Sequence, residues 1–303
     1  MRVSVAIAAL NEGLDLEATI ALLDASKTRP CEVIVYDDGS VVPVEDRLAK
    51  WSPWCRVMRS DRRLGSGPAK HLAADACTGD AVVIMDAHMR PPWDWIDLLV
   101  AEHEKNPGAI LCARSTGYES ASEFDGQGAD LKMEAAGFWE PKWALPTMSR
   151  KPRNVPCVYG GLYFMPRTVM RAVGGYAPAY MGWGCEEEYL SLRAWITGHS
   201  CRLVPSLVVP HQYVRPVNRT DSEGNEPIRW ETQYNRHVAA VVCFGEVSYT
   251  RYYARSIPLP RDCADALLSR QSEIHAAMKH IAANRTIDDQ ELSALCGVVH
   301  STE

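Results

Sequence analysis

The stretch that decides the fold spans residues 82–92 and reads VVIMDAHMRPP. An apolar run leads directly into Asp86, and His88 follows two positions later. Because successive side chains of a strand point to opposite faces, Asp86 and His88 are predicted to leave a buried strand on the same side. A carboxylate and an imidazole that converge at a strand end suit a divalent metal. The alternative is a turn, in which Asp86 bonds its own backbone before the two prolines.

The first ninety residues alternate between strand and helix patterns. Strands are predicted at 2–10, 31–40, 55–60 and 81–87, and helices at 14–26 and 67–76. This alternation predicts an α/β fold with a mainly parallel sheet flanked by helices on both faces. Ligands of such sheets bind outside the carboxyl ends of the strands. Polar pairs fall at three of these ends: Asn11 and Glu12, Asp37 and Asp38, Asp86 and His88.

The rest of the chain divides into an aromatic part and a helical part. Residues 91–211 are rich in Trp, Gly and Pro, and we expect them to be irregular. Aromatic residues beside glycines indicate a cleft in which rings stack on a ligand and the backbone approaches it closely. After a polar break near residue 218, helices are predicted at 228–244 and 263–284.

Composition narrows the class of protein. The chain has 303 residues, 47% of them apolar and 23% charged, which is typical of a soluble globular protein. The formal charge of -6 argues against tight non-specific binding to nucleic acids. No apolar run approaches the length of a membrane span, and the N-terminal run is too short for a signal peptide. The scattered cysteines lack C-x-x-C spacing, so reduced thiols and a cytoplasmic location are expected.

Six motifs occur in an order that resembles the GT-A glycosyltransferases. They are VSVAIAALNE, VIVYDDGS, VVIMDAH, GGLYFMPR, GWGCEEEYLSLRAW and VVPH, and the stretches RSDRRLG and GFWEPKW add to the likeness. The chain is most similar in these motifs to the catalytic domain of polypeptide N-acetylgalactosaminyltransferases and to family 2 glycosyltransferases. The resemblance implies a GT-A (Rossmann-like) sheet and a catalytic domain at 1–217. Within it, 1–90 would be the nucleotide-binding half and 91–217 the acceptor and sugar half, with 218–303 a mainly helical C-terminal extension.

The resemblance also implies an activity. It predicts metal-dependent transfer of a sugar from a UDP-sugar (UDP-GalNAc, UDP-GlcNAc, UDP-Gal or UDP-Glc) to a hydroxyl acceptor. The acceptor classes are protein Ser/Thr, a modified nucleic-acid base, a glycan and a small molecule. The membrane anchor and lectin domain of the animal enzymes have no counterpart in the sequence, which indicates a bare cytosolic module of bacterial or viral kind. A sugar-1-phosphate nucleotidyltransferase is disfavoured because AALNEGLDL does not resemble its glycine-rich loop, and a silent nucleotide-sugar-binding module stays open.

Nucleotide-binding residues follow from the same resemblance. Asp38 would accept the N–H of the uracil ring, with the backbone near Ala8 completing the base pocket. Asp37 would instead close an Asx turn. Arg63 would lie near the nucleotide, with a solvated surface arginine as the alternative.

Metal ligands are implied at Asp86 and His88, which form a DXH motif, and at His211. Asp86 would thereby also contact the nucleotide's diphosphate through the metal. Two histidines favour Mn²⁺, with Mg²⁺ as the alternative because it prefers oxygen ligands. A structural role is the alternative for the lone His211.

The segment GWGCEEEYLSLRAW holds the catalytic candidates. Glu186 would contact the sugar hydroxyls and Trp183 would line the site, although an acidic first helical turn explains the glutamates equally simply. Glu187 stands where retaining relatives have asparagine and inverting ones an aspartate base. The overall resemblance implies that the anomeric configuration of the sugar is retained. A carboxylate at Glu187 keeps inversion of that configuration open, because it can deprotonate a hydroxyl. The basic residue expected after the third ligand is displaced to Arg215.

Overall fold

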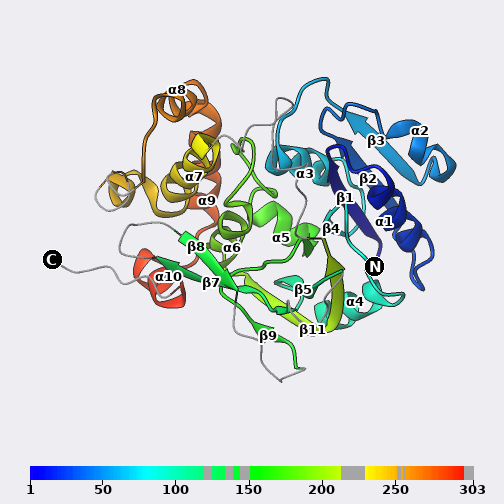
Figure 1. Cartoon of the computed structure of the whole chain (residues 1–303). Coiled ribbons are helices and arrows are strands. Elements are labelled where there is room, and N and C mark those ends of the chain that lie inside the picture. Colours follow the sequence, from blue (N-terminus) through cyan, green and yellow to red (C-terminus); the bar gives the residue numbers. More distant parts are fainter. Residues whose placement is uncertain are drawn as a thin grey trace.

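The N-terminal part forms the predicted α/β layers. A computed structural model describes residues 1–118, 125–133, 139–143, 151–212, 229–250, 254 and 257–296. Its first strands are β1 (Val3–Ala9), β2 (Glu32–Asp37), β3 (Cys55–Arg59) and β4 (Ala81–Asp86). They lie parallel in the order β3-β2-β1-β4 (Figure 1). Helices α1 (Leu14–Asp24), α2 (Glu45–Leu48) and α3 (Ser66–Asp75) and the 3-10 helix η1 (Ala49–Trp51) connect them.

The continuous apolar runs of these strands follow from burial on both faces. Ala6 of β1 packs into one hydrophobic core, whereas its neighbours Val5 and Ile7 pack into the core on the other face. A strand covered on both sides has no solvent face, so apolar residues occupy both sets of alternating positions. The predicted strands and helices of the first ninety residues are therefore confirmed.

The expectation that residues 91–211 are irregular is wrong. This part contains α4 (Trp95–Lys105), β5 (Ala109–Gly117), β6 (Asp125–Gly126), β7 (Ala129–Met133), β8 (Trp139–Trp143), β9 (Arg153–Asn154), β10 (Leu162–Pro166), α5 (Arg167–Ala172), α6 (Glu186–Ile196) and β11 (Ser200–His211). The glycines and prolines that suggested irregularity concentrate in the connections. Strand β10 inserts antiparallel between β4 and β5, while β11 pairs parallel with β5, so the sheet is mixed.

The C-terminal part is helical, as expected. It contains α7 (Arg229–Ser248), α8 (Arg261–Ser269), α9 (Gln271–Asn284) and α10 (Asp289–Cys296). The single helix predicted at 263–284 is divided, because Arg270 ends α8 with φ -108° and α9 begins after it. Helices α7, α8 and α9 gather at one side of the molecule next to α6 (Figure 1). Tyr234 and Val238 of α7 share a hydrophobic core with Tyr189 of α6, so these helices pack into the α/β part.

None of the helices within the described ranges combines the length and the apolar character needed to cross a lipid bilayer.

The fold brings several strand ends to one edge of the sheet. Strands β1, β2 and β4 are parallel, so their carboxyl ends meet there, and the residues that follow them lie close together. Strand β11 ends at His211, which forms an isolated antiparallel bridge with Met89. The end of β11 is thereby brought against the turn that follows β4.

Candidate functional site

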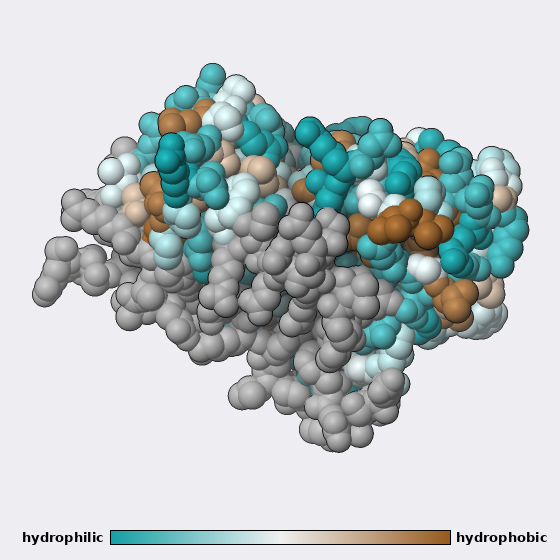
Figure 2. Space-filling view, turned by 45° about the horizontal axis from the view of Figure 1, so that its top comes forward, coloured by the Kyte–Doolittle hydropathy of each residue, from teal (hydrophilic) through white to brown (hydrophobic). Residues whose placement is uncertain are grey.

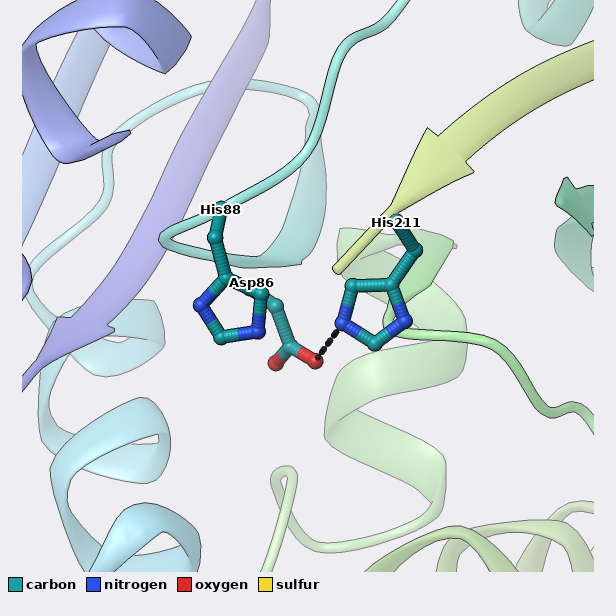
Figure 3. A group of neighbouring side chains, drawn as sticks. All are labelled: Asp86, His88 and His211. Atoms are coloured by element: carbon teal, nitrogen blue, oxygen red, sulfur yellow. Dashed lines mark ion pairs between the residues drawn. The ribbon is translucent and has the colours of Figure 1, made fainter. Parts of the chain in front are cut away.

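Asp86, His88 and His211 form a compact cluster at this edge of the sheet. One potential ligand atom from each lies within 4.8 Å of the others, and the three side chains point toward one another (Figure 3). The imidazole rings of His88 and His211 are nearly parallel, with centroids 5.0 Å apart. His211 Nε2 lies 3.1 Å from Asp86 Oδ2. The sequence therefore identified a group that the fold assembles.

His88 reaches this cluster by a different route from the one expected. Strand β4 ends at Asp86, and His88 belongs to the turn that follows. Strand alternation consequently does not place the imidazole, and the expectation about its path is corrected. A hydrogen bond orients it instead: Glu12 Oε2, after the end of β1, lies 3.1 Å from His88 Nδ1.

The donor set fits a divalent metal. With Nδ1 held by a carboxylate, His88 presents Nε2 as a ligand, which is the usual arrangement around metal-bound histidines. Burial lowers the pKa of His211 in spite of the neighbouring Asp86, and this favours the neutral imidazole that coordinates metals. Two imidazoles and a carboxylate suit Mn²⁺ better than Mg²⁺. Glu12 appeared in the sequence only as an acidic residue at a strand end.

Lys70 adds a buried positive charge beside the cluster. Its Nζ lies 2.5 Å from Asp86 Oδ1, and only 7% of the residue is exposed. Burial by itself raises the pKa of Asp86, but Lys70 and then His211 lower it well below its usual range. Asp86 is thus a carboxylate shared between a lysine and the candidate metal position. Sequence reasoning missed Lys70, because one lysine in an alanine-rich helix carries no signal.

Glu186 and Trp183 lie where the segment GWGCEEEY enters helix α6. Glu186 is buried; its Oε1 accepts a hydrogen bond from Ser66 Oγ at 2.7 Å and its Oε2 accepts one from Gly184 N at 2.9 Å. Burial, and then the charge of Glu187, raise the pKa of Glu186 to about 7. Trp183 is 55% exposed, which leaves its ring available to a ligand.

Glu187 is held by a residue that the sequence did not single out. Its Oε1 accepts a hydrogen bond of 2.7 Å from the hydroxyl of Tyr163 on β10. Burial by itself lowers the pKa of Lys70. The negative charges of Asp86, Glu187 and Glu186 together outweigh this effect and raise the pKa. The charges of Glu186, Glu187 and Asp86 therefore all act on one lysine, and Asp86 forms an ion pair with it.

Asp37 and Asp38 make different hydrogen bonds, and those of Asp37 confirm the turn expected of it. Asp37 Oδ1 accepts from Ser40 N at 3.0 Å, so Asp37 closes its own turn. Asp38 is buried, and its two oxygens accept the backbone N–H groups of Leu64 at 2.6 Å and Gly65 at 2.8 Å. Burial raises the pKa of Asp38 against the effect of these bonds. Each carboxylate oxygen retains a second lone pair for a ligand.

Ala8 and Arg63 are the other residues expected to bind the nucleotide, and both lie near Asp38. Ala8 on β1 is the register partner of Tyr36 on β2 and of Asp86 on β4, so its backbone lies between the Asp38 turn and the metal cluster. Arg63 is exposed, and it directly precedes Leu64 and Gly65, whose N–H groups donate to Asp38. A Cβ on Gly39 would lie 3.1 Å from Arg63 N, so the two segments pack closely.

Side chains of helix α7 hydrogen-bond to the backbone of the loop that carries Trp183. Asn235 is fully buried; its Oδ1 accepts from Met181 N at 3.0 Å, and its Nδ2 donates to Met181 O at 2.7 Å and Gly184 O at 3.0 Å. Thr232 Oγ1 donates to Trp183 O at 3.1 Å. The C-terminal helices thus position residues 181–184, a role that no sequence motif indicated.

A cleft of about 920 Å³ opens beside this loop, between α3 and α9. Arg63, Gly182 and Glu231 are among the residues that line it, whereas Asp86, His88 and His211 are not part of its lining. Asp86, His88 and His211 thus form a candidate metal site that is separate from this cleft. On the face shown in Figure 2, the described residues are mostly hydrophilic, with apolar residues in separate patches.

Two expectations lie partly or wholly outside the described residues. Of GFWEPKW at 137–143, the structure describes only 139–143, which form β8 and pair antiparallel with β7. Arg215 lies outside the described residues altogether.

Comparison with known proteins places this architecture among enzymes of one kind. The family model for glycosyl transferase family 2 matches residues 4–174, more than half of the chain. Polypeptide N-acetylgalactosaminyltransferase 10 of Mus musculus is 28% identical over 200 residues, covering 61% of this chain and 33% of the relative. Polypeptide N-acetylgalactosaminyltransferase 5 of Caenorhabditis elegans is 23% identical over 245 residues, covering 75% of this chain and 38% of the relative. The chain thus spans little more than a third of the length of these relatives.

Solved structures agree on the fold. The crystal structure of GalNAc-T7 with UDP, GalNAc and Mn²⁺ matches with a TM-score of 0.71 at 20% identity, covering 98% of this chain and 57% of that one. The structure of S. aureus TarS 1-349 in complex with UDP-GlcNAc matches with a TM-score of 0.57 at 13% identity, covering 97% and 84% of the two chains. The mixed sheet, its flanking helices and the helical C-terminal part are those of the GT-A fold.

Proposed function

From the premise that this chain belongs to glycosyl transferase family 2, we propose that it transfers a sugar from a UDP-sugar to a hydroxyl acceptor in a metal-dependent reaction. The observation that carries the proposal is the Asp86, His88 and His211 cluster, which lies at the carboxyl edge of the sheet. The donor classes are UDP-GalNAc, UDP-GlcNAc, UDP-Gal and UDP-Glc. GalNAc-T7 and TarS, which share the fold, were crystallised with UDP and with UDP-GlcNAc.

Asp86, His88 and His211 would hold Mn²⁺, with Mg²⁺ as the alternative. The metal would neutralise the negative charge that develops on the leaving diphosphate. Lys70 provides a second positive charge, at the Asp86 oxygen that His211 does not contact. Glu12 keeps the His88 ring in the orientation that leaves Nε2 available. Charge stabilisation at the leaving group is commonly the largest catalytic contribution of such a site.

The remaining site residues receive roles from their positions. Asp38 and the backbone near Ala8 would bind the uracil, and Arg63 would lie beside the nucleotide. Glu186 would hydrogen-bond the sugar hydroxyls, and the exposed Trp183 ring would line the sugar and acceptor side. In this scheme residues 1–90 bind the nucleotide, 91–217 bind sugar and acceptor, and the extension 218–303 supports the site through Asn235.

Two stereochemical courses are open to this site. Retention is what the resemblance to the N-acetylgalactosaminyltransferases implies. Inversion is the second candidate, and one observation favours it: among the described residues, the Glu187 carboxylate is anchored through Oε1 alone, by Tyr163. A carboxylate in that state can accept a proton from an attacking hydroxyl. Proton NMR of the new anomeric centre separates the two, because only inversion yields a β-linked product from an α-linked UDP-sugar.

The test of the activity is UDP release. Purified protein is incubated with each of the four UDP-sugars and Mn²⁺, and UDP is measured with and without acceptors from the protein, nucleic-acid, glycan and small-molecule classes. Mass spectrometry then identifies the acceptor that gains a sugar. We expect UDP release that Asp86→Asn abolishes. Tight UDP-sugar binding without any turnover would instead support a silent binding module.

A further inference from the structure

Tyr163 is a buried tyrosine whose hydroxyl makes two hydrogen bonds. Its side chain is fully buried within strand β10 and is stacked on Tyr176, with ring centroids 6.4 Å apart. Burial, and then the charge of Glu187, raise the pKa of Tyr163 well above its usual value, so the hydroxyl keeps its proton. That hydroxyl accepts a hydrogen bond from Gly161 N at 2.9 Å and donates one to Glu187 Oε1 at 2.7 Å. With its acceptor site already used by Gly161, the hydroxyl directs its proton to Glu187.

Glu187 itself is fixed at one oxygen only. It lies in the first turn of α6 and is partly exposed. Oε1 is held by Tyr163, while Oε2 makes no hydrogen bond to any residue in the described part of the chain. An anchored carboxylate with one available oxygen has the geometry required of a general base.

Gly161 connects this pair to the candidate metal ligand. Its carbonyl accepts a hydrogen bond from Asp86 N at 2.9 Å, and its N–H donates to Tyr163. Gly161 has a positive φ of 81°, and a Cβ there would lie 2.6 Å from Asp86 Oδ2. The backbone of one glycine thus contacts Asp86 on one side and the tyrosine that holds Glu187 on the other. The spacing between Glu187 and the metal ligand is set by this short chain of contacts.

We infer that Tyr163 is a positioning residue, which fixes the Glu187 carboxylate so that Oε2 removes the proton from the incoming hydroxyl. The inference rests on the proposed function in its inverting form. In that step the acceptor oxygen forms a bond to the anomeric carbon, and its proton passes to Glu187 Oε2. The bond between the anomeric carbon and the diphosphate breaks, and its electron pair leaves with UDP.

Tyr176 provides a matched control for a purely structural role of Tyr163. Both tyrosines are fully buried in the same core and stack on each other. The Tyr176 hydroxyl, however, has no hydrogen-bond partner in the described part of the chain. Replacing either tyrosine by phenylalanine removes one buried oxygen, but only Tyr163→Phe releases Glu187.

The experiment compares Tyr163→Phe, Tyr176→Phe, Glu187→Gln and the double variant Tyr163→Phe/Glu187→Gln. The measured reaction is UDP release from the UDP-sugar that the unmodified protein turns over fastest with Mn²⁺, with water as acceptor. We expect Tyr163→Phe to lower kcat about tenfold, as loss of a hydrogen bond to a charged group does, with KM for the donor within about twofold. Glu187→Gln should lower kcat at least about a hundredfold, and the double variant should be no slower. Tyr176→Phe should retain the kcat of the unmodified protein.

Several outcomes would overturn the inference. An unchanged kcat in Tyr163→Phe, a change in KM alone, or fully additive losses in the double variant would each show that Tyr163 does not act through Glu187. A retained anomeric configuration would also refute it while leaving glycosyl transfer intact. If the unmodified protein releases no UDP from any of the four donors, the proposed function fails, and the inference fails with it. Thermal unfolding of every variant shows whether a lost activity reflects a lost fold.

Discussion

Lys70 Nζ lies 2.5 Å from Asp86 Oδ1, while His211 Nε2 lies 3.1 Å from the other oxygen of the same carboxylate. Asp86 is therefore shared between a permanent cation and an imidazole. A metal at the Asp86, His88 and His211 cluster would compete with Lys70 for the charge of Asp86. At the same time, Lys70 would add to the positive charge that faces a diphosphate.

Replacing Lys70 by methionine separates these two effects. We expect Mn²⁺ to bind more tightly to Lys70→Met, because the carboxylate no longer shares its charge. We also expect kcat for UDP release to fall at least about tenfold, because one stabilising charge at the leaving group is lost. Calorimetry with Mn²⁺ and a turnover assay measure the two quantities. Weaker Mn²⁺ binding in the variant would contradict competition for Asp86.

Activity should require all three clustered ligands. Alanine at Asp86, His88 or His211 is expected to lower kcat about a hundredfold or more, and excess chelator should abolish UDP release from the unmodified protein. His275→Ala is the control, because His275 lies on the surface of α9, away from the cluster. Full activity in chelator would show that the cluster does not serve a catalytic metal.

Asp38 should determine uridine binding. Asp38→Asn is expected to weaken UDP binding at least about tenfold. The amide accepts hydrogen bonds only at its oxygen, whereas the carboxylate accepts them at both oxygens. The same change weakens the hydrogen bonds that Asp38 accepts from the N–H groups of Leu64 and Gly65. We therefore also expect the free energy of unfolding to fall by about 1–3 kcal/mol. Calorimetry below the unfolding temperature separates the two effects. Equal UDP affinity in the variant and the unmodified protein would remove Asp38 from the base pocket.

Glu188 should make stability depend on pH. Burial, and then the charge of Glu187, raise the pKa of Glu188 to about 8, and its Oε2 lacks a hydrogen-bond partner among the described residues. Because the pKa is higher in the folded state, the free energy of unfolding should fall as pH rises from about 4.5 to about 8.

Glu188→Gln should remove this dependence. We expect the variant to be more stable than the unmodified protein near pH 8, by on the order of a few kcal/mol, with little difference near pH 4. Urea unfolding of the two proteins at both pH values measures the effect. A constant difference at all pH values would contradict titration of Glu188.

We expect Asn235, which links helix α7 to residues 181 and 184, to affect turnover. Asn235→Ala removes three hydrogen bonds to the backbone of residues 181 and 184. We expect kcat/KM for the donor to fall about tenfold or more, because residues 181–184 lead into Glu186 and an unsatisfied buried backbone costs about 1–3 kcal/mol per group. Asn284→Ala is the control, since the hydrogen bond that this exposed side chain makes among the described residues stays within α9. A change in stability without a change in kcat/KM would limit Asn235 to a structural role.

The amino-acid sequence alone determined the layered N-terminal half and two of the three residues of the candidate metal site. Apolar runs covered on both faces specify β1 to β4, and parallel strands necessarily bring their carboxyl ends to one edge. Asp86 ends one of these strands and His88 follows two positions later, so their proximity is a local property. His211 was identified through the order of motifs, and the fold confirmed its place beside Asp86.

Only the tertiary structure decided which side chains complete the site. The antiparallel insertion of β10 brings Tyr163 to Glu187, helix α3 carries Lys70 to Asp86, and α7 places Asn235 under the Trp183 loop. Each contact joins residues that are distant in the chain, and none has a local pattern, because a buried lysine, tyrosine or asparagine resembles any other in sequence. Their roles depend on side-chain direction and burial, which are set by packing between elements and not by the periodicity within one.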